Sequence, residues 1–156
     1  MPNFTHFNEN GYAKMVDVAG KPVTAREAVA CGSVFFNKQT FDLVKNGCIK
    51  KGDVLAVAQV AGIMAAKQTS GFIPMCHPVI LTGIDINFAF IDESFIINIS
   101  ASVRCTGQTG VEMEALTAVS AAALTIYDMC KSVQKDIVIG DIKLLQKTGG
   151  SSGDIG

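Results

Sequence analysis

Apolar residues alternate with polar or small ones in the middle of the chain, and this pattern predicts a β-hairpin. From Ile84 to Phe90 every second residue is a large apolar one, and the same period of two continues from Phe95 to Val103. A period of two is typical of a strand with one buried face. Asp92-Glu93-Ser94 lies between the two runs and supplies turn-forming residues. We therefore expect two antiparallel strands joined by a short turn.

Two helices are expected before this hairpin. The segment from Thr40 to Lys45 has helical character and is closed by Asn46-Gly47, and Asp53 can cap a second helix that runs through Lys67. The second helix has apolar residues at helical spacing, namely Val57, Val60, Ala61 and Met64. Lys50 and Lys51 lie in the connection between the two helices.

The longest predicted element is a helix from about Gly110 to Val133. Thr109-Gly110-Val111-Glu112 matches a capping box, in which the first and last side chains cap each other's backbone. Apolar residues then recur with a helical period at Leu116, Val119, Ala123, Ile126, Cys130 and Val133. The charged residues of this helix are few, namely Glu112, Glu114, Asp128 and Lys131. We therefore expect it to be mostly buried.

A last strand is expected between Asp136 and Lys147, where β-branched residues predominate around a break at Gly140. The segment that follows is rich in glycine and serine, and we expect a flexible tail from about residue 148. The rest of the chain contains no repeat, so residues 1–156 are expected to form one domain. Helices combined with a hairpin and a returning strand predict an α+β sandwich, with helices on one face of a mainly antiparallel sheet.

Composition narrows the possible functions. The 156 residues are 49% hydrophobic and only 17% charged, which leaves little polar surface for a lone small domain and favours contacts between subunits. The net charge is -1 and no basic run occurs, so a nucleic-acid partner is not expected. No apolar run is long enough for a membrane span, and Met1 to Val18 lacks the pattern of a signal peptide. We expect a cytoplasmic protein.

The five cysteines predict free thiols. They are scattered, their number is odd and no Cys-x-x-Cys pair occurs, so neither a disulfide framework nor an iron-sulfur cluster is indicated. Cys76 and His77, with or without His6, do not have the spacing of a recognisable zinc site. We expect no metal held by the protein alone.

Asp128 and Lys131 are the first candidates for chemistry. They lie three residues apart and share a helix face, where a lysine can hold a carboxylate ionised or exchange a proton with a substrate. An intrahelical ion pair without function explains the spacing equally well. Glu114 lies on nearly the same face, but at about 1.5 Å per residue it is roughly 21 Å from Asp128. Either only one of them is catalytic, or the ligand is long, or a second subunit completes the site.

A second candidate is the segment from Ile73 to Pro78, in which two prolines bracket Cys76 and His77. Prolines on both sides stiffen the backbone, as suits a binding loop. His77 can orient a ligand or transfer protons near neutral pH, or it can be satisfied by local hydrogen bonds. Cations that could hold an anion are spread along the chain, at Arg26, Lys50, Lys51, Arg104, Lys131 and Lys147.

Five motifs, in this order along the chain, resemble the cyclic pyranopterin monophosphate synthase family. The resemblance covers about Thr5 to Asp154, which is nearly the whole sequence. The motifs are Met15-Val16-Asp17-Val18, Lys51-Gly52-Asp53-Val54, the segment from Ile73 to Pro78, the segment from Thr109 to Ala118 and the segment from Ile126 to Lys131.

This resemblance implies a ferredoxin-like subunit in a homohexamer, a trimer of dimers with active sites at the dimer interface. It implies a phosphorus-oxygen lyase that converts 3',8-cyclo-7,8-dihydro-GTP, a GTP-derived cyclic nucleotide, to cyclic pyranopterin monophosphate with release of pyrophosphate. The reaction follows a radical S-adenosylmethionine GTP cyclase in molybdenum cofactor biosynthesis. No tightly bound cofactor is implied, although Mg²⁺ can accompany the substrate phosphates.

The resemblance also assigns residues. Asp128, Lys131 and Lys51 match catalytic positions. The residues implied to bind substrate are Met75, Cys76, His77, Glu112, Met113 and Glu114, with Arg26 and Lys147 near the phosphates; for Glu112, the capping box offers a structural explanation instead. Gln108 and Ser151 depart from the family, whose members often have lysine there.

Two other classes of protein remain compatible with the residues alone. A noncatalytic module that binds a nucleotide or metabolite would explain the fold and the proline-bracketed loop, but not Asp128 and Lys131 on an apolar helix. A structural assembly subunit would explain the apolar composition and little else. Release of pyrophosphate from the cyclised substrate would separate the enzyme from both.

Overall fold

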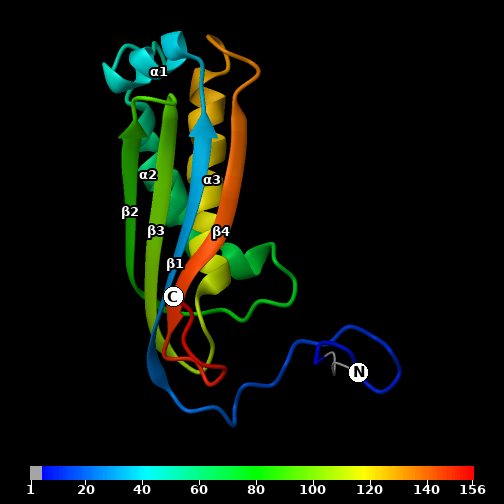
Figure 1. Cartoon of the computed structure of the whole chain (residues 1–156). Coiled ribbons are helices and arrows are strands. Elements are labelled where there is room, and N and C mark those ends of the chain that lie inside the picture. Colours follow the sequence, from blue (N-terminus) through cyan, green and yellow to red (C-terminus); the bar gives the residue numbers. More distant parts are fainter. Residues whose placement is uncertain (1–4) are drawn as a thin grey trace.

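The computed structural model describes residues 5–156 and contains one four-stranded sheet covered on one face by two helices (Figure 1). The strands pair antiparallel in the order β2-β3-β1-β4. Their bounds are Thr24–Phe35 for β1, Leu81–Ile91 for β2, Ile96–Gly107 for β3 and Val138–Thr148 for β4. The helices are α1 (Lys38–Lys45), α2 (Val54–Lys67), the 3-10 helix η1 (Thr69–Gly71) and α3 (Glu112–Cys130). The α+β sandwich is confirmed, and it is consistent with a ferredoxin-like fold.

The predicted hairpin is confirmed as β2 and β3, which are longer than their alternating cores indicated. The turn between them includes Phe95 with a φ of 56°. β4 confirms the predicted return to the sheet, at its edge beside β1. Near Gly140 the β1–β4 register shifts and Asp141 has a φ of 55°, so the expected break is a local irregularity in a continuous strand.

The strand β1 was missed by the pattern analysis, although it is central in the sheet. Its sequence is dominated by small residues, which carry little strand propensity. Tertiary packing explains their size: a Cβ added at Gly32 would lie 2.7 Å from Cγ1 of Val119. The small residues of β1 therefore let α3 lie close against the sheet.

α3 is the central element of the hydrophobic core. Its buried face includes Ala115, Ala118, Val119, Ala122, Ala123 and Ile126, which are all fully buried. The neighbouring helix approaches it at Gly62, where an added Cβ would lie 2.9 Å from the carbonyl oxygen of Ala118. The helix was expected to be mostly buried, and this is confirmed. It ends at Cys130, before the predicted Val133.

The capping box predicted at the start of α3 is wrong. The N-cap residue is Val111, and no side chain caps the helix. The Glu112 carboxylate is instead directed to Lys147, with 3.4 Å between Oε1 and Nζ. A partner from β4 therefore replaces the local backbone interaction that the four-residue pattern indicated.

The second predicted helix is confirmed as α2, but the apolar stripe that indicated it is not its buried face. Asp53 caps the helix by accepting a hydrogen bond from the amide of Ala56. Val57, Val60 and Met64 are 46%, 61% and 47% exposed. The buried positions are Val54, Ala58, Gly62 and Ala66. Smaller residues thus face α3, while the larger ones remain uncovered in the single chain.

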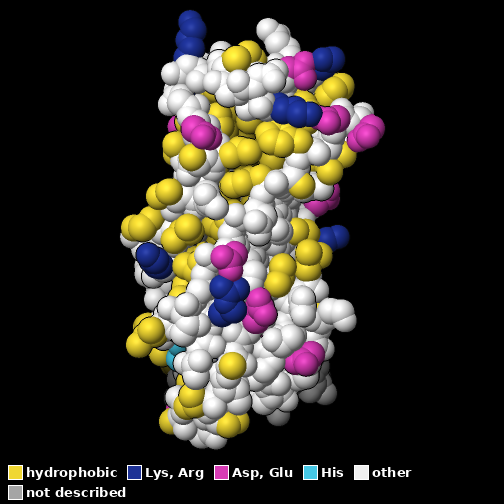
Figure 2. All heavy atoms as spheres, turned by 90° about the vertical axis from the view of Figure 1, so that its left-hand side faces the viewer, with side chains coloured by type: hydrophobic (Ala, Val, Ile, Leu, Met, Phe, Trp, Pro, Cys, Tyr) yellow, Lys and Arg dark blue, Asp and Glu magenta, His cyan; other side chains and the backbone are white. Residues whose placement is uncertain are grey.

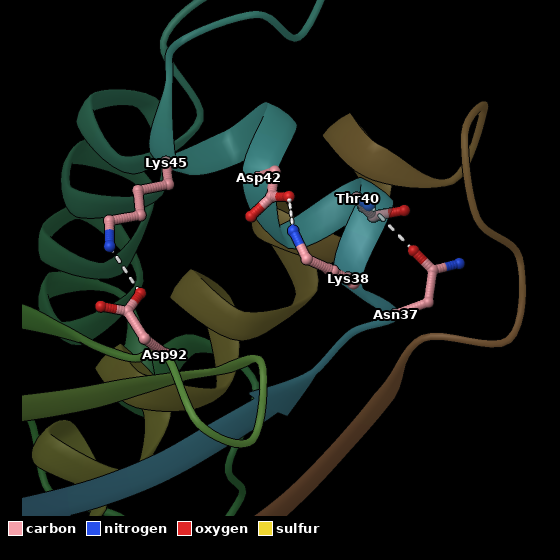
Figure 3. Close-up of polar contacts among 6 residues, drawn as sticks. All are labelled: Asn37, Lys38, Thr40, Asp42, Lys45 and Asp92. Atoms are coloured by element: carbon pink, nitrogen blue, oxygen red, sulfur yellow. Dashed lines mark hydrogen bonds and ion pairs between the residues drawn. The ribbon is translucent and has the colours of Figure 1, made fainter.

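The first helix, α1, closes one end of the sandwich and is fixed by polar contacts (Figure 3). Asn37 caps it by accepting a hydrogen bond from the amide of Thr40 at 2.8 Å. Lys38 and Asp42 form an ion pair within the helix, and Lys45 pairs with Asp92 in the β2–β3 turn, both at 2.5 Å. The second pair joins α1 to the end of the hairpin.

The segment after β4 folds back along the strand. Lys147 and Ile155 form an isolated antiparallel bridge, and the carbonyl oxygen of Gly149 accepts a hydrogen bond from Thr24. Gly149 has a φ of 81°, and an added Cβ would lie 2.1 Å from the carbonyl oxygen of Ala25, so glycine is required there. The flexibility expected from the composition stays a prediction. Within residues 5–156, no helix has both the length and the apolar character needed to span a membrane.

Substitution of Thr40 tests the packing around α1. Thr40 is fully buried, and its Oγ1 has no hydrogen-bond partner within the described residues. Thr40→Val keeps the shape and removes an unpaired hydroxyl, so we expect the free energy of unfolding to rise by about 1 kcal/mol. Thermal and urea unfolding measure this change.

The matched control is Thr69→Val. The Thr69 side chain is equally buried, but its Oγ1 donates to the carbonyl oxygens of Ala65 and Ala66 at 3.2 and 3.0 Å. Its replacement should lower stability by about 1 kcal/mol. A loss of stability in both variants would contradict the interpretation of Thr40.

Candidate active site

A cavity of about 480 Å³ lies at the N-terminal end of α3. Three segments line it: the N-terminal segment, the proline-bracketed loop and the residues that lead into α3. Six of the eight residues predicted to bind substrate line this cavity: Met75, Cys76, His77, Glu112, Met113 and Glu114. The structure therefore brings three of the five sequence motifs together at one site, because Val16 and Val18 of the first motif also line the cavity.

His77 joins the loop to the N-terminal segment. Its Nε2 lies 2.6 Å from the carbonyl oxygen of Val16. A carbonyl oxygen can only accept, so the imidazole carries a proton on Nε2, and in the neutral ring Nδ1 remains an acceptor. The partner lies 61 residues away in sequence. The hydrogen bond fixes the orientation of the ring, while the residue still lines the cavity.

Glu114 is the acidic group most removed from solvent in the cavity. It is 5% exposed, and burial raises the pKa of its carboxyl above the ordinary value, with a further contribution from the nearby charge of Glu112. The pKa of the Cys76 thiol is also raised, chiefly by burial and then by the charge of Glu114. These shifts make Glu114 a group that can hold or give up a proton closer to neutral pH than an exposed glutamate.

Lys147 and Arg26 lie at the margin of this region and do not line the cavity. Lys147 pairs with Glu112 and donates a hydrogen bond to Oγ of Ser152 at 2.8 Å. The Arg26 side chain is buried, and its Nε donates to the carbonyl oxygen of Gly107 at 2.9 Å. The structure thus ties both cations to the folded chain, and their roles with phosphates stay predictions.

The three residues predicted to be catalytic form a separate cluster at the other end of α3. Nζ of Lys131 lies 2.6 Å from Oδ1 of Asp128, and Nζ of Lys51 lies 3.5 Å from Oδ2. Lys51 also donates to the carbonyl oxygen of Asp128 at 2.8 Å. Lys131 and then Lys51 lower the pKa of Asp128, and Asp128 raises the pKa of Lys131. The cluster is a carboxylate held ionised between two ammonium groups on an exposed surface.

The two clusters occupy opposite ends of one helix. Glu114 is in the first turn of α3 and Asp128 is in the last. The rise of about 1.5 Å per residue places them roughly 21 Å apart along the axis. Within one chain, the cluster around Asp128 and the cavity therefore cannot both contact one small reacting centre.

The N-terminal segment also lines the cavity, although no periodic pattern in the sequence indicated a site there. The residues concerned are Thr5, His6, Val16, Val18 and Lys21. These residues reach the cavity because the chain turns back toward α3, and such a turn leaves no periodic pattern of apolar residues in the sequence. The one indication was that the motif Met15-Val16-Asp17-Val18 belongs to the resemblance.

Within residues 5–156, no group of three or more His, Cys, Asp or Glu side chains is arranged to hold a metal ion. All five cysteines are free thiols, as predicted. The carboxylates near the cavity are Glu112, which pairs with Lys147, and the largely buried Glu114.

The pKa of Glu114 leads to a test of stability against pH. Because its folded pKa is raised, the stability it contributes is present below the ordinary glutamate pKa of about 4.3 and is lost as pH rises through the folded value. Glu114→Gln stays neutral, so we expect it to be more stable than wild type at neutral pH, by a margin that shrinks toward about pH 4. Urea unfolding at several pH values measures the margin.

Glu112→Gln is the control for this test. It removes the charge that pairs with Lys147, so stability at neutral pH should fall. A stability margin of Glu114→Gln that is the same at acid and neutral pH would contradict the assignment of a raised pKa.

Several known proteins are similar to this chain over nearly its whole length. A protein from Thermoanaerobacter sp. (strain X514) is 61% identical over 97% of this chain and 96% of its own length. Proteins from Halalkalibacterium halodurans and Bacillus thuringiensis (strain Al Hakam) are 58% and 56% identical over 99% of this chain, and over 94% and 97% of their own lengths. All three are named cyclic pyranopterin monophosphate synthase. The model of the MoaC family matches residues 15–150, and the chain belongs to the MoaC family.

Proposed function

We propose that this chain is a cyclic pyranopterin monophosphate synthase, a lyase of molybdenum cofactor biosynthesis. It converts 3',8-cyclo-7,8-dihydro-GTP to cyclic pyranopterin monophosphate and pyrophosphate. The observation that carries this proposal is the match to relatives of that name at 56–61% identity over nearly their full lengths. The two polar clusters at the ends of α3 supply groups suited to the two parts of the reaction, proton transfer and phosphate displacement.

Proton transfer belongs to Asp128, Lys131 and Lys51. An ammonium group can donate a proton and the ionised carboxylate can accept one, so the cluster holds an acid and a base within 2.6 Å of each other. Rearrangement of the purine-derived ring into a pterin requires several such transfers. When substrate enters, its polar groups replace part of the contact between Asp128 and Lys131, which moves the pKa values of these two groups toward neutral pH.

Phosphate displacement requires positive charge. An internal hydroxyl attacks the α-phosphorus, the bond to the pyrophosphate oxygen breaks, and negative charge grows on the leaving group. Lys51 and Lys131 stabilise this charge, with Arg26 and Lys147 near the phosphate chain. Any Mg²⁺ arrives bound to the substrate phosphates, because this ion favours phosphate and water oxygens over dedicated protein ligands.

The cavity holds the ring system of the substrate. Met75, Met113 and Cys76 provide polarizable surface for a flat heterocycle, and Glu112, Glu114 and His77 provide polar groups for its edge. Glu114 can exchange a proton with a ring nitrogen because burial raises its pKa. A protonated Glu114 donates a hydrogen bond and an ionised one accepts it.

A second subunit completes each active site. The separation of roughly 21 Å between the two clusters is resolved if the cavity of one protomer faces the catalytic cluster of its partner. Exposed hydrophobic side chains support assembly: Val57, Val60 and Met64 on α2 and Leu124 on α3 are uncovered in the single chain. Figure 2 shows hydrophobic side chains gathered over much of the face on the β2 side. The proposed assembly is a homohexamer, a trimer of dimers, that acts in the cytoplasm after a radical S-adenosylmethionine GTP cyclase.

Single substitutions in the catalytic cluster test the reaction. We expect Lys51→Ala and Asp128→Asn to fold normally and to lower product formation at least about a hundredfold, because each removes a proton-transferring or charge-stabilising group. Pyrophosphate release and the fluorescent oxidised pterin are followed with the cyclised substrate. Lys38→Ala is the matched control, because it breaks another exposed Lys–Asp pair away from the site. Near-normal turnover by either cluster variant would contradict its role.

Mixing of inactive variants tests the shared site. Lys51→Ala and Glu114→Gln are each expected to have low activity, but they alter opposite ends of α3. When they are unfolded and reassembled together in equal amounts, about a quarter of the sites should contain both wild-type ends. Recovery of about that fraction of wild-type activity supports a site built from two subunits. No recovery in mixed oligomers verified by native mass spectrometry would contradict it.

A further inference from the structure

The N-terminal segment forms one wall of the cavity through residues 16–21, which we call the strap. Val16, Val18 and Lys21 of the strap line the cavity. The strap contains no helix or strand, and its other residues are exposed. It runs beside the lower end of the sheet in Figure 1, between residues 5–15 and β1. A segment with so little buried surface depends on a few specific hydrogen bonds for its position.

Gln108 supplies two of these bonds. Its Nε2 donates to the carbonyl oxygen of Ala19 at 3.0 Å and to that of Lys21 at 3.2 Å. A side-chain amide has two N–H groups, so it can serve both carbonyl oxygens at once. His77 holds the other end of the strap through Val16, at 2.6 Å. Gln108 is thus the residue that fixes the strap closest to Lys21.

The strap has an internal turn that makes it a compact unit. The amide of Ala19 donates to Oδ1 of Asp17 at 2.8 Å, and the amide of Lys21 donates to the carbonyl oxygen of Val18 at 2.9 Å. Because these bonds lie within the strap, they shape it without attaching it to the rest of the protein. Once the strap is detached, the turn is supported by these bonds alone, so its amides should be exposed to solvent more often.

Lys21 is the cation that the strap brings to the cavity. It makes no ion pair within the described residues, whereas the carboxylate of Glu112, which also lines the cavity, is paired with Lys147. An ammonium group without a carboxylate partner is available to an anionic ligand. The phosphate chain of a nucleotide that occupies the cavity would provide such an anion.

We propose that Gln108 is a positioning residue that holds the strap against the cavity so that Lys21 contacts the phosphates of the bound substrate. The identity of that substrate rests on the function proposed above. The role of Gln108 is indirect, because it is the strap and Lys21 that meet the ligand. Its loss lowers the fraction of molecules with the strap in place, and the apparent affinity falls in proportion to that fraction.

The first test separates substrate binding from turnover. Gln108→Ala should raise KM about tenfold, the effect expected from two neutral hydrogen bonds, while kcat changes less than about twofold. Gln108→Lys keeps a donor that can reach the two carbonyl oxygens and should restore a KM near wild type. Gln59→Ala is the matched control, because it removes a similar amide-to-carbonyl bond, to Ile86 at 3.1 Å, away from the cavity. An unchanged KM for Gln108→Ala, or an equal rise for Gln59→Ala, would overturn the proposal.

A double-mutant cycle tests whether Gln108 acts through Lys21. Lys21→Met should raise KM by itself, and Gln108→Ala should then add little in the Lys21→Met background. If the two effects on KM multiply as independent changes do, Gln108 does not work by placing Lys21, and this part of the proposal is wrong.

A measurement without turnover keeps the proposal distinct from the proposed reaction. Amide hydrogen exchange at Ala19 and Lys21 should be faster in Gln108→Ala than in wild type and unchanged in Gln59→Ala. If wild type makes no product, the reaction proposed above is wrong. The role of Gln108 is then tested by amide exchange and by equilibrium binding of GTP. Gln108→Ala should weaken GTP binding about tenfold. Unchanged exchange and unchanged GTP binding would overturn the positioning role.

Discussion

The close packing of α3 against β1 and α2 is the constraint on which the rest of the molecule depends. It requires glycine at two positions: a side chain at Gly32 would collide with Val119, and one at Gly62 would collide with Ile86 and Ala118. Alanines fill most of the remaining contact, so the helix lies against the sheet with little space between backbones. The ends of α3 are therefore held in fixed positions relative to the sheet, and so are the functional groups at those ends.

The two ends have different electrostatic environments. At the N-terminal end, Glu114 is enclosed and its pKa is raised because the carboxylate has lost water. At the C-terminal end, Asp128 is exposed and its pKa is lowered because two ammonium groups face it. One helix thus presents a carboxyl group whose pKa is raised and another whose pKa is lowered. Two carboxyl groups with pKa values pushed apart in this way can serve as acid and base in one enzyme.

Segments outside regular secondary structure bring the cavity residues together. The loop that bears His77 and the N-terminal strap meet through one hydrogen bond, while Gln108 attaches the strap to the end of β3. These connections bury little apolar surface, so the cavity wall is less firmly held than the sandwich behind it.

The sequence by itself determined the helices and strands that have a strong period of apolar residues. It also determined which acidic, basic and histidine side chains are candidates for chemistry. The hairpin, α2, α3 and the final strand follow from local patterns, because the period of the apolar residues distinguishes a strand from a helix. Local patterns failed where distant partners decide the outcome. β1 has small residues because α3 packs on it, Val57 and Val60 are uncovered because smaller residues face α3, and Glu112 pairs with Lys147 instead of closing a capping box.

The candidate site shows the same division. Sequence motifs singled out Asp128, Lys131, Lys51 and the loop at His77. The rise per residue of an α-helix already implied that Glu114 and Asp128 are far apart. Only the tertiary structure decided that the N-terminal segment forms a wall of the cavity and that Gln108 attaches it. The physical reason is that hydrogen bonds between segments far apart in the chain leave no periodic trace in the sequence, whereas burial of one face of a helix or strand does.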